Sequence, residues 1–278
     1  MRTLTTGLAL GESPRWHEDR LWFVDMGTHR VGAVGPDGAY ELVADVPGMP
    51  MGIGWLPDGR MLIVSSQDGQ LLQRDVDGKL TGYADLSTLD NHPWSDMAVD
   101  GRGNAYVGCI GFDFPDGPPS PGILALVTRD GVVRRVAEDL MFPNGIAVTA
   151  DNSTLIVAES YAHRLTAFDI APDGTLGNRR VWAELPGDFP DGICLDAEGA
   201  VWYASVPGRH CVRVREGGEV LRTIELDGGC FACVLGGEGR RTLFVMIADW
   251  GGPQSMTGEQ RTGRAVAIEV EVPGVGWP

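Results

Sequence analysis

Three short phrases of the sequence place an oxygen-bearing side chain at one point of a repeated pattern. Two of them, Pro143–Ile146 and Pro190–Ile193, read Pro-Asn-Gly-Ile and Pro-Asp-Gly-Ile and lie 47 residues apart. Each leads through a turn to an apolar run that is typical of a β-strand. A degraded third copy, Gly11–Pro14, precedes a similar run near the start of the chain. If the three phrases hold one position in successive structural repeats, their polar side chains point to a common centre.

The polar residues of these phrases are Glu12, Asn144 and Asp191. Two carboxylates and an amide oxygen, without Cys or His, favour Ca²⁺, Mg²⁺ or Mn²⁺, and Zn²⁺ also accepts carboxylates. Three protein ligands leave coordination positions open for water and substrate, as a catalytic metal requires. Ordinary turns are the alternative interpretation, because Asn-Gly and Asp-Gly pairs are common there. The shared position before an apolar strand favours one bound divalent cation, with Ca²⁺ as the first expectation.

Short β-strands must position these residues. Six Asp-Gly pairs indicate tight hairpin turns, because both residues tolerate the positive φ that such turns need: Asp37-Gly38, Asp58-Gly59, Asp68-Gly69, Asp77-Gly78, Asp130-Gly131 and Asp173-Gly174. Six strand-like apolar runs punctuate the chain: Leu21–Asp25, Met61–Ser65, Ala105–Gly108, Leu155–Ala158, Val201–Ala204 and Leu243–Met246. No long stretch shows a helical period with caps. The chain is therefore predicted to be all-β.

The six runs align into one repeat. Counting back from each run gives equivalent positions that are 39, 44, 49, 47 and 40 residues apart: Glu12, Met51, Ser95, Asn144, Asp191 and Phe231. These steps are close to the period of a four-stranded propeller blade. We predict a six-bladed β-propeller that occupies residues 1–278 as a single domain, with the metal site in the central channel, because the innermost strand of each blade lines that channel. A β-sandwich is the alternative fold, but its strands would not carry one polar phrase at one register.

The composition limits the classes of partner. The chain has 278 residues, of which 43% are hydrophobic, which is enough for a full core. A net charge of −16 without a Lys/Arg cluster argues against nucleic acid and anionic membranes and leaves a small-molecule substrate as the expected partner. No signal peptide and no membrane-spanning apolar run is visible, and five irregularly spaced cysteines suit the reduced thiols of the cytoplasm. The sequence leaves the oligomeric state open.

One long segment, Ile110–Gly122, departs from the repeat and contains two phenylalanines and four prolines. Such a loop suits a lid over a pocket, and a solvent loop stiffened by proline is equally compatible. Large apolar side chains and one histidine are expected at the same end of the blades: Met49, Met51, His92, Trp94, Phe112, Phe114, Phe142, Tyr161, Phe189, Phe231 and Trp250. A pocket with this lining suits a largely apolar substrate better than a polyhydroxylated one.

The chain resembles the SMP-30/gluconolactonase family of six-bladed, regucalcin-like propellers. The resemblance covers nearly the whole chain and rests on four segments: Gly11–Trp16, Phe142–Ala147, Asp191–Asp196 and Gly236-Gly237 before Leu243–Val245. In that family the residues that match Glu12, Asn144 and Asp191 hold a divalent cation, and the Asp is the proposed general base. Characterised members hydrolyse sugar lactones, and relatives hydrolyse other lactones or phosphoryl esters. The resemblance implies a metal-dependent hydrolase of a lactone or related ester, with Asp191 as its catalytic residue.

One motif departs from the family pattern. The family commonly has an Asn-Asp pair where this chain has Ser95-Asp96, and sugar lactonases often carry an Arg at the position of Pro93. Asp96 matches the pattern, whereas Ser95 replaces an amide that often contacts the metal or the substrate. We therefore expect a substrate that is less polar than a sugar lactone, contacted by Ser95, Asp96, Trp94, Met51, Phe112, Phe114 and Phe231.

Two other functions fit the same residues. One is a non-hydrolytic Lewis-acid enzyme, such as an isomerase, dehydratase or cyclase, and the other is a metal-stabilised binding propeller without catalysis. A serine nucleophile is not indicated, because the chain contains no Gly-x-Ser-x-Gly motif and no histidine with an evident Ser and Asp partner.

Overall fold

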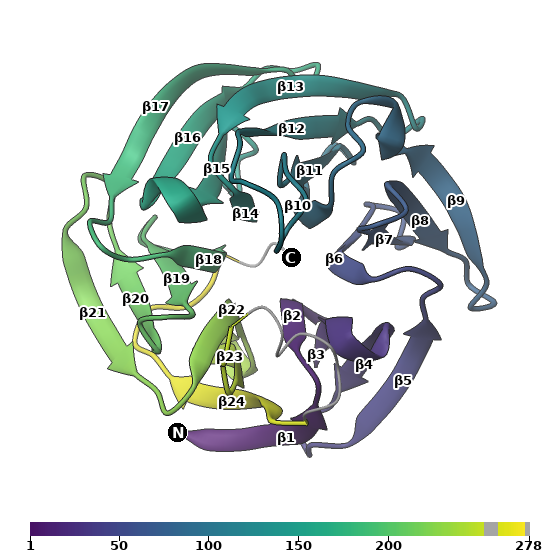
Figure 1. Cartoon of the computed structure of the whole chain (residues 1–278). Helices are drawn as coiled ribbons and strands as arrows, with labels where there is room; N and C mark the ends of the chain where they lie inside the picture. The colour runs from purple at the N-terminus through teal and green to yellow at the C-terminus, as the bar shows by residue number, and fades with distance from the viewer. Residues whose placement is uncertain (253–260, 276–278) are drawn as a thin grey trace.

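Six four-stranded antiparallel sheets surround a central axis in the computed structural model of the chain (Figure 1). The structure describes residues 1–252 and 261–275. The prediction of an all-β, six-bladed propeller is confirmed. Within those two ranges the helical elements are single 3₁₀ turns: η1 (Met26–Thr28), η2 (Leu86–Thr88), η3 (Ser160–Ala162) and η4 (Glu238–Arg240). In the part of the chain described here, no helix has the length and hydrophobicity needed to cross a membrane.

The strands of each blade are given in order from the innermost to the outermost. Blade 1 contains β2 (Gly11–His17), β3 (Arg20–Asp25), β4 (Arg30–Val34) and β5 (Tyr40–Asp45), and blade 2 contains β6 (Pro50–Trp55), β7 (Met61–Ser65), β8 (Gln70–Arg74) and β9 (Leu80–Asp85). Blade 3 contains β10 (Trp94–Val99), β11 (Ala105–Cys109), β12 (Gly122–Val127) and β13 (Val133–Leu140), and blade 4 contains β14 (Pro143–Val148), β15 (Thr154–Glu159), β16 (Arg164–Ile170) and β17 (Leu176–Glu184). Blade 5 contains β18 (Pro190–Leu195), β19 (Val201–Ser205), β20 (His210–Val214) and β21 (Val220–Glu225).

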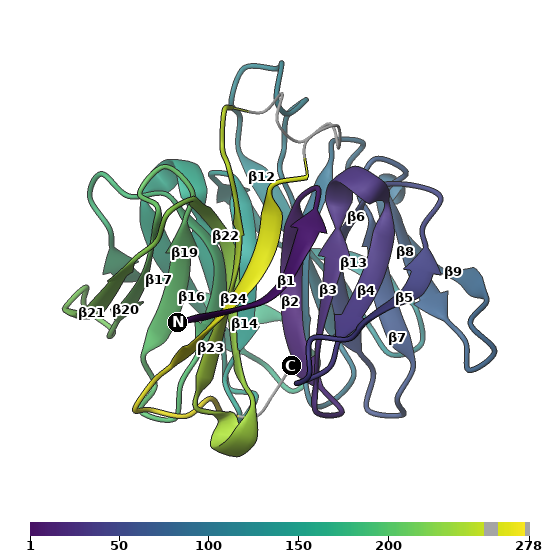
Figure 2. The same cartoon turned by 90° about the horizontal axis from the view of Figure 1, so that it is seen from below.

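Blade 6, the last blade, is completed by the first strand of the chain. Its strands, from the axis outward, are β22 (Gly229–Gly236), β23 (Thr242–Ala248), β24 (Gly263–Glu269) and β1 (Arg2–Leu8). Strand β1 pairs antiparallel with β24, so the first and the last strand of the described chain lie side by side in one sheet (Figures 1 and 2). The sequence analysis assigned no strand to residues 2–8. Pairing the first strand with the last blade closes the ring by hydrogen bonds and leaves no gap between the first and last repeats.

The predicted turns and apolar strands are confirmed. The glycines of the six Asp-Gly pairs have φ values between 60° and 86°, a region that an L side chain rarely adopts. The six apolar runs coincide with the second strand of each blade, which are β3, β7, β11, β15, β19 and β23. Strands β7, β11 and β19 are buried along their whole length. These strands are covered on both faces by neighbouring blades, which explains why they are continuously apolar.

The predicted repeat position falls at the start of the innermost strands. It is the second residue of β2, β6, β10, β14 and β18 and the third residue of β22. In every blade the innermost strand carries one extra residue, relative to the second strand, close to this point. A β-bulge of this kind bends a strand and re-aims the side chains beside it. The repeated bulge thus changes the direction of side chains at the end of the channel where the ligand residues lie.

Candidate functional site

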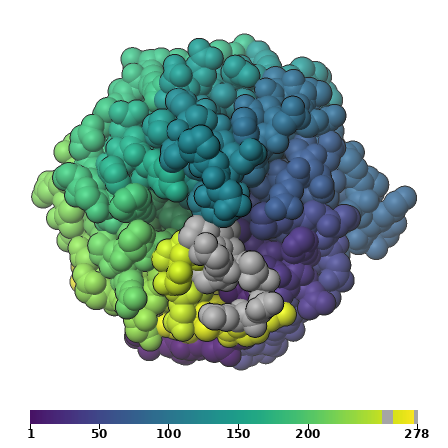
Figure 3. Space-filling model, viewed as in Figure 1, coloured from purple at the N-terminus to yellow at the C-terminus, as the bar shows by residue number. Residues whose placement is uncertain are grey.

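A cavity of about 340 Å³ lies at one end of the central channel and contains all three predicted ligand residues, Glu12, Asn144 and Asp191. Figure 3 shows this face of the molecule, where the loop after β11 reaches toward the axis, and Figure 2 shows that loop rising above the blades. Most of the remaining lining is apolar: Leu10, Met26, Met49, Met51, Ile110, Phe114, Phe142, Tyr161, Phe189, Val206, Phe231 and Trp250. Ser66, Gln67 and Ser160 are further polar residues of the lining, so the cavity combines several polar side chains with a largely apolar wall.

The ligand residues come from the innermost strands of blades 1, 4 and 5. Asn144 Nδ2 donates a hydrogen bond to Ser160 Oγ at 3.3 Å, and Glu12 Oε2 accepts one from the backbone N–H of Ser13 at 3.1 Å. Asp191 Oδ1 is buried and has no hydrogen-bond partner among the residues that the structure describes. A buried carboxylate oxygen without a donor costs free energy, and a cation at this point would satisfy it.

Burial dominates the electrostatics of the two carboxyl groups. It raises the pKa of Glu12 to about 8, with a smaller contribution from the charge of Asp96. Burial also raises the pKa of Asp191 well above its usual range, and the neighbouring charge of Glu12 adds to the effect, while Asn144 opposes it. Two neighbouring carboxylates repel each other when both are charged, and a bound cation would relieve that repulsion. The donor set and the unsatisfied oxygen therefore fit a hard divalent cation.

The donor set consists of two carboxylates and one amide. In residues 1–252 and 261–275 no three or more His, Cys, Asp or Glu side chains are arranged to hold a metal ion. The predicted set contains only two residues of those types, since its third member is the amide Asn144. The metal site accordingly remains a prediction that rests on Glu12, Asn144 and Asp191 together.

Asp96 takes part in a buried network next to the site. Its Oδ1 accepts a hydrogen bond from Ser13 Oγ at 2.8 Å and forms an ion pair with Arg15 Nη2 at 3.0 Å. Ser13 Oγ also accepts the backbone N–H of Ile53 at 3.1 Å, and Ser13 has a left-handed φ of 46°. These bonds hold Ser13 in a conformation that is unfavourable for a residue with a Cβ. The network thereby fixes the backbone next to Glu12, and Asp96 does not line the cavity.

The other predicted substrate contacts fall into two groups. Met51, Phe114 and Phe231 line the cavity. Ser95 Oγ instead lies 2.7 Å from the carbonyl oxygen of Pro143, to which it donates, and Trp94 is fully buried in the core. None of Ser95, Asp96 and Trp94 lines the cavity, so their contact with a substrate stays a prediction.

Phe112 belongs to an aromatic cluster behind the cavity wall. Its ring centroid lies 6.2 Å from that of Phe114, 5.8 Å from that of Phe142 and 6.0 Å from that of Tyr161. The last three residues line the cavity, whereas Phe112 does not. The loop after β11 therefore places one of its two phenylalanines in the wall and packs the other against the wall from outside.

A second ring of residues that was not predicted from the sequence also lines the cavity. Each directly follows the second strand of its blade: Met26, Ser66, Ile110, Ser160 and Val206. Two of the five are serines and three are apolar, so no single residue type marks the position. Their shared place in the blade is the only sequence signal, and it is usable only once the strand ends are known.

A Ser/Asp/His set occurs near the cavity, which the sequence did not reveal. Asp188 Oδ2 lies 2.7 Å from His210 Nε2 and accepts the hydroxyl of Tyr203 at 2.8 Å, while Ser205 Oγ donates to Asp188 Oδ1. The aspartate stands between the serine and the histidine, and Ser205 is completely buried. A histidine that does not contact the serine cannot take its proton, so these residues hold the loop that enters β18.

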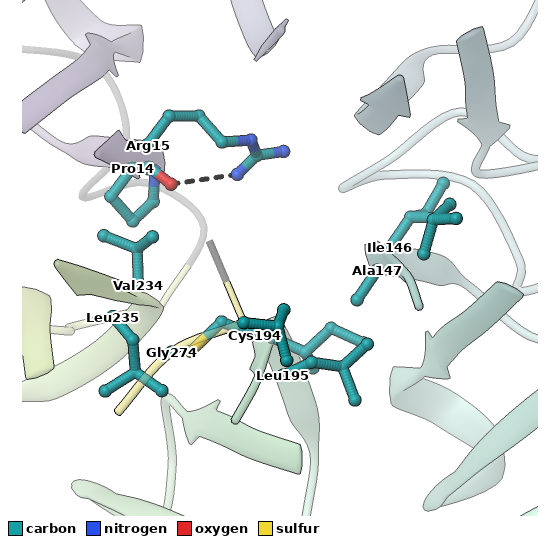
Figure 4. A pocket seen from close by; sticks show the side chains of 12 residues that line it. Pro14, Arg15, Ile146, Ala147, Cys194, Leu195, Val234, Leu235 and Gly274 are labelled. Atoms are coloured by element: carbon teal, nitrogen blue, oxygen red, sulfur yellow. Dashed lines mark hydrogen bonds between the residues drawn. The ribbon is translucent and has the colours of Figure 1, made fainter. Parts of the chain in front are cut away.

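The opposite end of the channel contains a much smaller cavity of about 40 Å³ (Figure 4). Pro14, Arg15, Cys194 and Gly274 are among its lining residues, and Arg15 Nη1 donates to the carbonyl oxygen of Pro14 at 3.0 Å. Gly274 pairs with Asp196 across a β-bridge, so the C-terminal part of the chain crosses this end. All five cysteines are free thiols. Of these two cavities in the channel, the larger is the one with room for a substrate.

Comparison with known proteins gives the class of this propeller. Residues 10–249 match the SMP-30/Gluconolactonase/LRE-like region, and the chain belongs to this family. It is 27% identical to the pentonolactonase XacC of Haloferax volcanii, over 100% of this chain and 96% of that protein. It is 28% identical to a 6-deoxy-6-sulfogluconolactonase of Pseudomonas putida, over 97% of this chain and 94% of that protein.

A solved structure shares the fold over the full length of the chain. The calcium-binding protein regucalcin from Agrobacterium tumefaciens superposes with a TM-score of 0.85 at 22% identity, covering 100% of this chain and 96% of that one. The similarity supports the six-bladed architecture independently of the family match.

Proposed function

We propose that this protein is a metal-dependent hydrolase of a lactone or related ester, acting in the cytoplasm. The observation that carries the proposal is the buried Oδ1 of Asp191, which has no hydrogen-bond partner in residues 1–252 and 261–275, in a cavity that Glu12 and Asn144 also line. The names of two full-length relatives, a pentonolactonase and a sulfogluconolactonase, support the reaction class. Glu12, Asn144 and Asp191 would hold the cation, with Ca²⁺ first and Zn²⁺, Mn²⁺ or Mg²⁺ as alternatives.

Different residues of the cavity have different roles in the proposed hydrolysis. A divalent cation bound there supplies Lewis-acid polarisation of the substrate carbonyl. Asp191 accepts the proton of the attacking water, a role worth about 10²–10⁴ in rate. The water oxygen bonds to the carbonyl carbon, the ring C–O bond breaks, and the departing oxygen takes a proton to give a hydroxy acid. The network of Ser13, Asp96 and Arg15 keeps the backbone beside Glu12 in place while this occurs.

The wall of the cavity favours a substrate with an apolar part. Met51, Phe114 and Phe231 offer no hydrogen bond to a sugar hydroxyl, and they line the same cavity as the three ligand residues. A buried hydroxyl without a partner costs about 1–3 kcal/mol, so several unmatched hydroxyls reduce affinity by orders of magnitude. We therefore expect alkyl- or aryl-substituted lactones to be better substrates than gluconolactone.

A comparison of kcat/KM for δ-gluconolactone and for phenyl-substituted lactones tests this proposal. The apolar lactones should react faster by at least about tenfold, which corresponds to about 1.4 kcal/mol. Asp191→Asn should abolish turnover of both without loss of the folded state, which shows that the hydrolysis belongs to this cavity. A preference for the sugar lactone would overturn the substrate assignment, and normal turnover by Asp191→Asn would overturn the mechanism.

A further inference from the structure

Ser160 occupies a position between two of the three ligand residues. It directly follows β15, lines the cavity and is only 6% exposed. Its Oγ accepts a hydrogen bond from Asn144 Nδ2 at 3.3 Å and donates one to the carbonyl oxygen of Pro190 at 2.7 Å. Because Pro190 immediately precedes Asp191, one hydroxyl links the ligand of blade 4 to the strand that carries the ligand of blade 5.

The direction of these two bonds fixes the orientation of an amide. A serine hydroxyl has one proton, and here that proton is given to the Pro190 carbonyl oxygen. Ser160 Oγ can therefore only accept from Asn144, so the NH₂ group of the amide must face Ser160. The carbonyl oxygen Oδ1 of Asn144 then faces away from Ser160. An amide oxygen can coordinate a hard cation, whereas an amide nitrogen that carries two hydrogens cannot.

We propose that Ser160 is a positioning residue, which sets the Asn144 amide so that its oxygen is presented as a ligand. This inference rests on the proposed metal site. Oxygen and nitrogen of an amide are nearly equal in size, so the cavity shape alone does not prevent the side chain from turning over. The Pro190 carbonyl, the Ser160 hydroxyl and the Asn144 amide form a chain of hydrogen bonds with a single direction.

The propeller repeat supplies a matched control. Ser66 directly follows β7 as Ser160 follows β15, and both line the cavity. The backbone N–H of Ser66 donates to the Met49 carbonyl at 2.9 Å, as that of Ser160 donates to the Phe142 carbonyl at 3.1 Å. Ser66 lies in blade 2, which carries none of the three ligands. Ser66→Ala thus removes the same hydroxyl from the same repeat position without touching the ligand set.

Calorimetric titration of chelator-treated protein with Ca²⁺ tests the role of Ser160. Loss of a hydrogen-bond partner behind a metal ligand typically costs 10–100-fold in affinity, and we expect Ser160→Ala to weaken Ca²⁺ binding by about this factor. Ser160→Thr, which keeps the hydroxyl, should bind almost as tightly as the wild type, and Ser66→Ala should bind as tightly. The melting temperature of each metal-free variant separates a loss of affinity from a loss of folding.

The same substitution in an Asn144→Asp background isolates orientation from packing. The two oxygens of a carboxylate are equivalent, so there is no amide to orient and Ser160→Ala should cost little affinity there. An equal loss in both backgrounds would mean that Ser160 acts through packing, and unchanged binding by Ser160→Ala alone would remove its role while leaving the metal site standing. A wild-type protein that binds none of Ca²⁺, Mg²⁺, Mn²⁺ and Zn²⁺ would overturn the metal site itself, and the role of Ser160 with it.

Discussion

At the scale of single residues, two carboxyl groups determine how the cavity behaves. Glu12 and Asp191 are half-buried neighbours in the cavity wall, and the nearby carboxylate of Asp96 forms an ion pair with Arg15. The cavity therefore keeps two acids without a cationic side chain bonded to either in the part of the chain described by the structure. Such a pair is stable either with protons or with a bound cation, which makes the charge state of the site depend on both.

The raised pKa of Glu12 predicts how the metal-free protein responds to pH. Folding raises this pKa from 4.5 to about 8, so in that window the folded protein binds a proton that the unfolded chain releases. The contribution of the protonated group is fully present below pH 4.5 and is lost as the pH rises through about 8. We expect the melting temperature of the metal-free protein to fall across this window and to fall less in Glu12→Gln. Equal pH dependence in the two proteins would contradict this assignment.

Some residues of the candidate site could be predicted from the sequence and others could not. Glu12, Asn144 and Asp191 were accessible from the sequence because their types and their spacing repeat together. The direction of Ser95 could not be predicted, because its hydroxyl donates to the Pro143 carbonyl of the next blade, a contact that exists only in the fold. The role of Ser160 could not be predicted, because only Ser66 among its equivalents in the other blades is also a serine, and the bonds of Ser160 to Asn144 and Pro190 form only in the fold.

At the scale of the elements, the innermost strands approach one another closely. A Cβ on Gly145 would lie 2.5 Å from the carbonyl oxygen of Asp191, and one on Gly192 would lie 2.3 Å from Cβ of Ala232. The glycine of each Pro-x-Gly-Ile phrase is thus required by contact between β14, β18 and β22. The phrase combines a ligand with the residue that lets the next blade come near enough for the ligands to meet.

This close approach predicts the effect of Gly145→Ala. The new methyl group must displace the backbone at Asp191, and overpacking of this kind costs about 1–3 kcal/mol of unfolding free energy. Gly177→Ala is the matched control, because Gly177 lies in the outer strand β17 and a Cβ there would meet no atom within 4 Å. Denaturant unfolding should place that control within about 0.5 kcal/mol of the wild type. Equal stabilities of the two variants would show that a methyl group fits between β14 and β18 without displacing the backbone.

The predictability of the elements follows from the same packing. The second strands are continuously apolar, and the Asp-Gly turns need a positive φ, so both could be identified from residue types alone. Strand β1 could not, because it lies at the outside of blade 6 and pairs with a strand that is distant in the sequence. Most of its seven residues are exposed, so its sequence shows no strong alternation of apolar and polar residues.

At the scale of the whole molecule, the ring creates a site that no single blade contains. Blades 1, 4 and 5 each supply one ligand, and strand β1 closes the ring by joining blade 6. One end of the channel holds the cavity of about 340 Å³, and the other narrows to about 40 Å³ where the C-terminal part of the chain crosses it. We therefore expect substrate and cation to enter from the face that carries the loop after β11.

The central claim is that the three ligands hold one cation on which hydrolysis depends. The most direct test is a titration of chelator-treated protein with Ca²⁺, in which the hydrolysis rate of a phenyl-substituted lactone is followed against the metal added per chain. We expect negligible activity at the start, a linear rise and a plateau at about one equivalent, since one set of three oxygen ligands fits one such ion. Full activity in the chelated protein before any metal is added would contradict it.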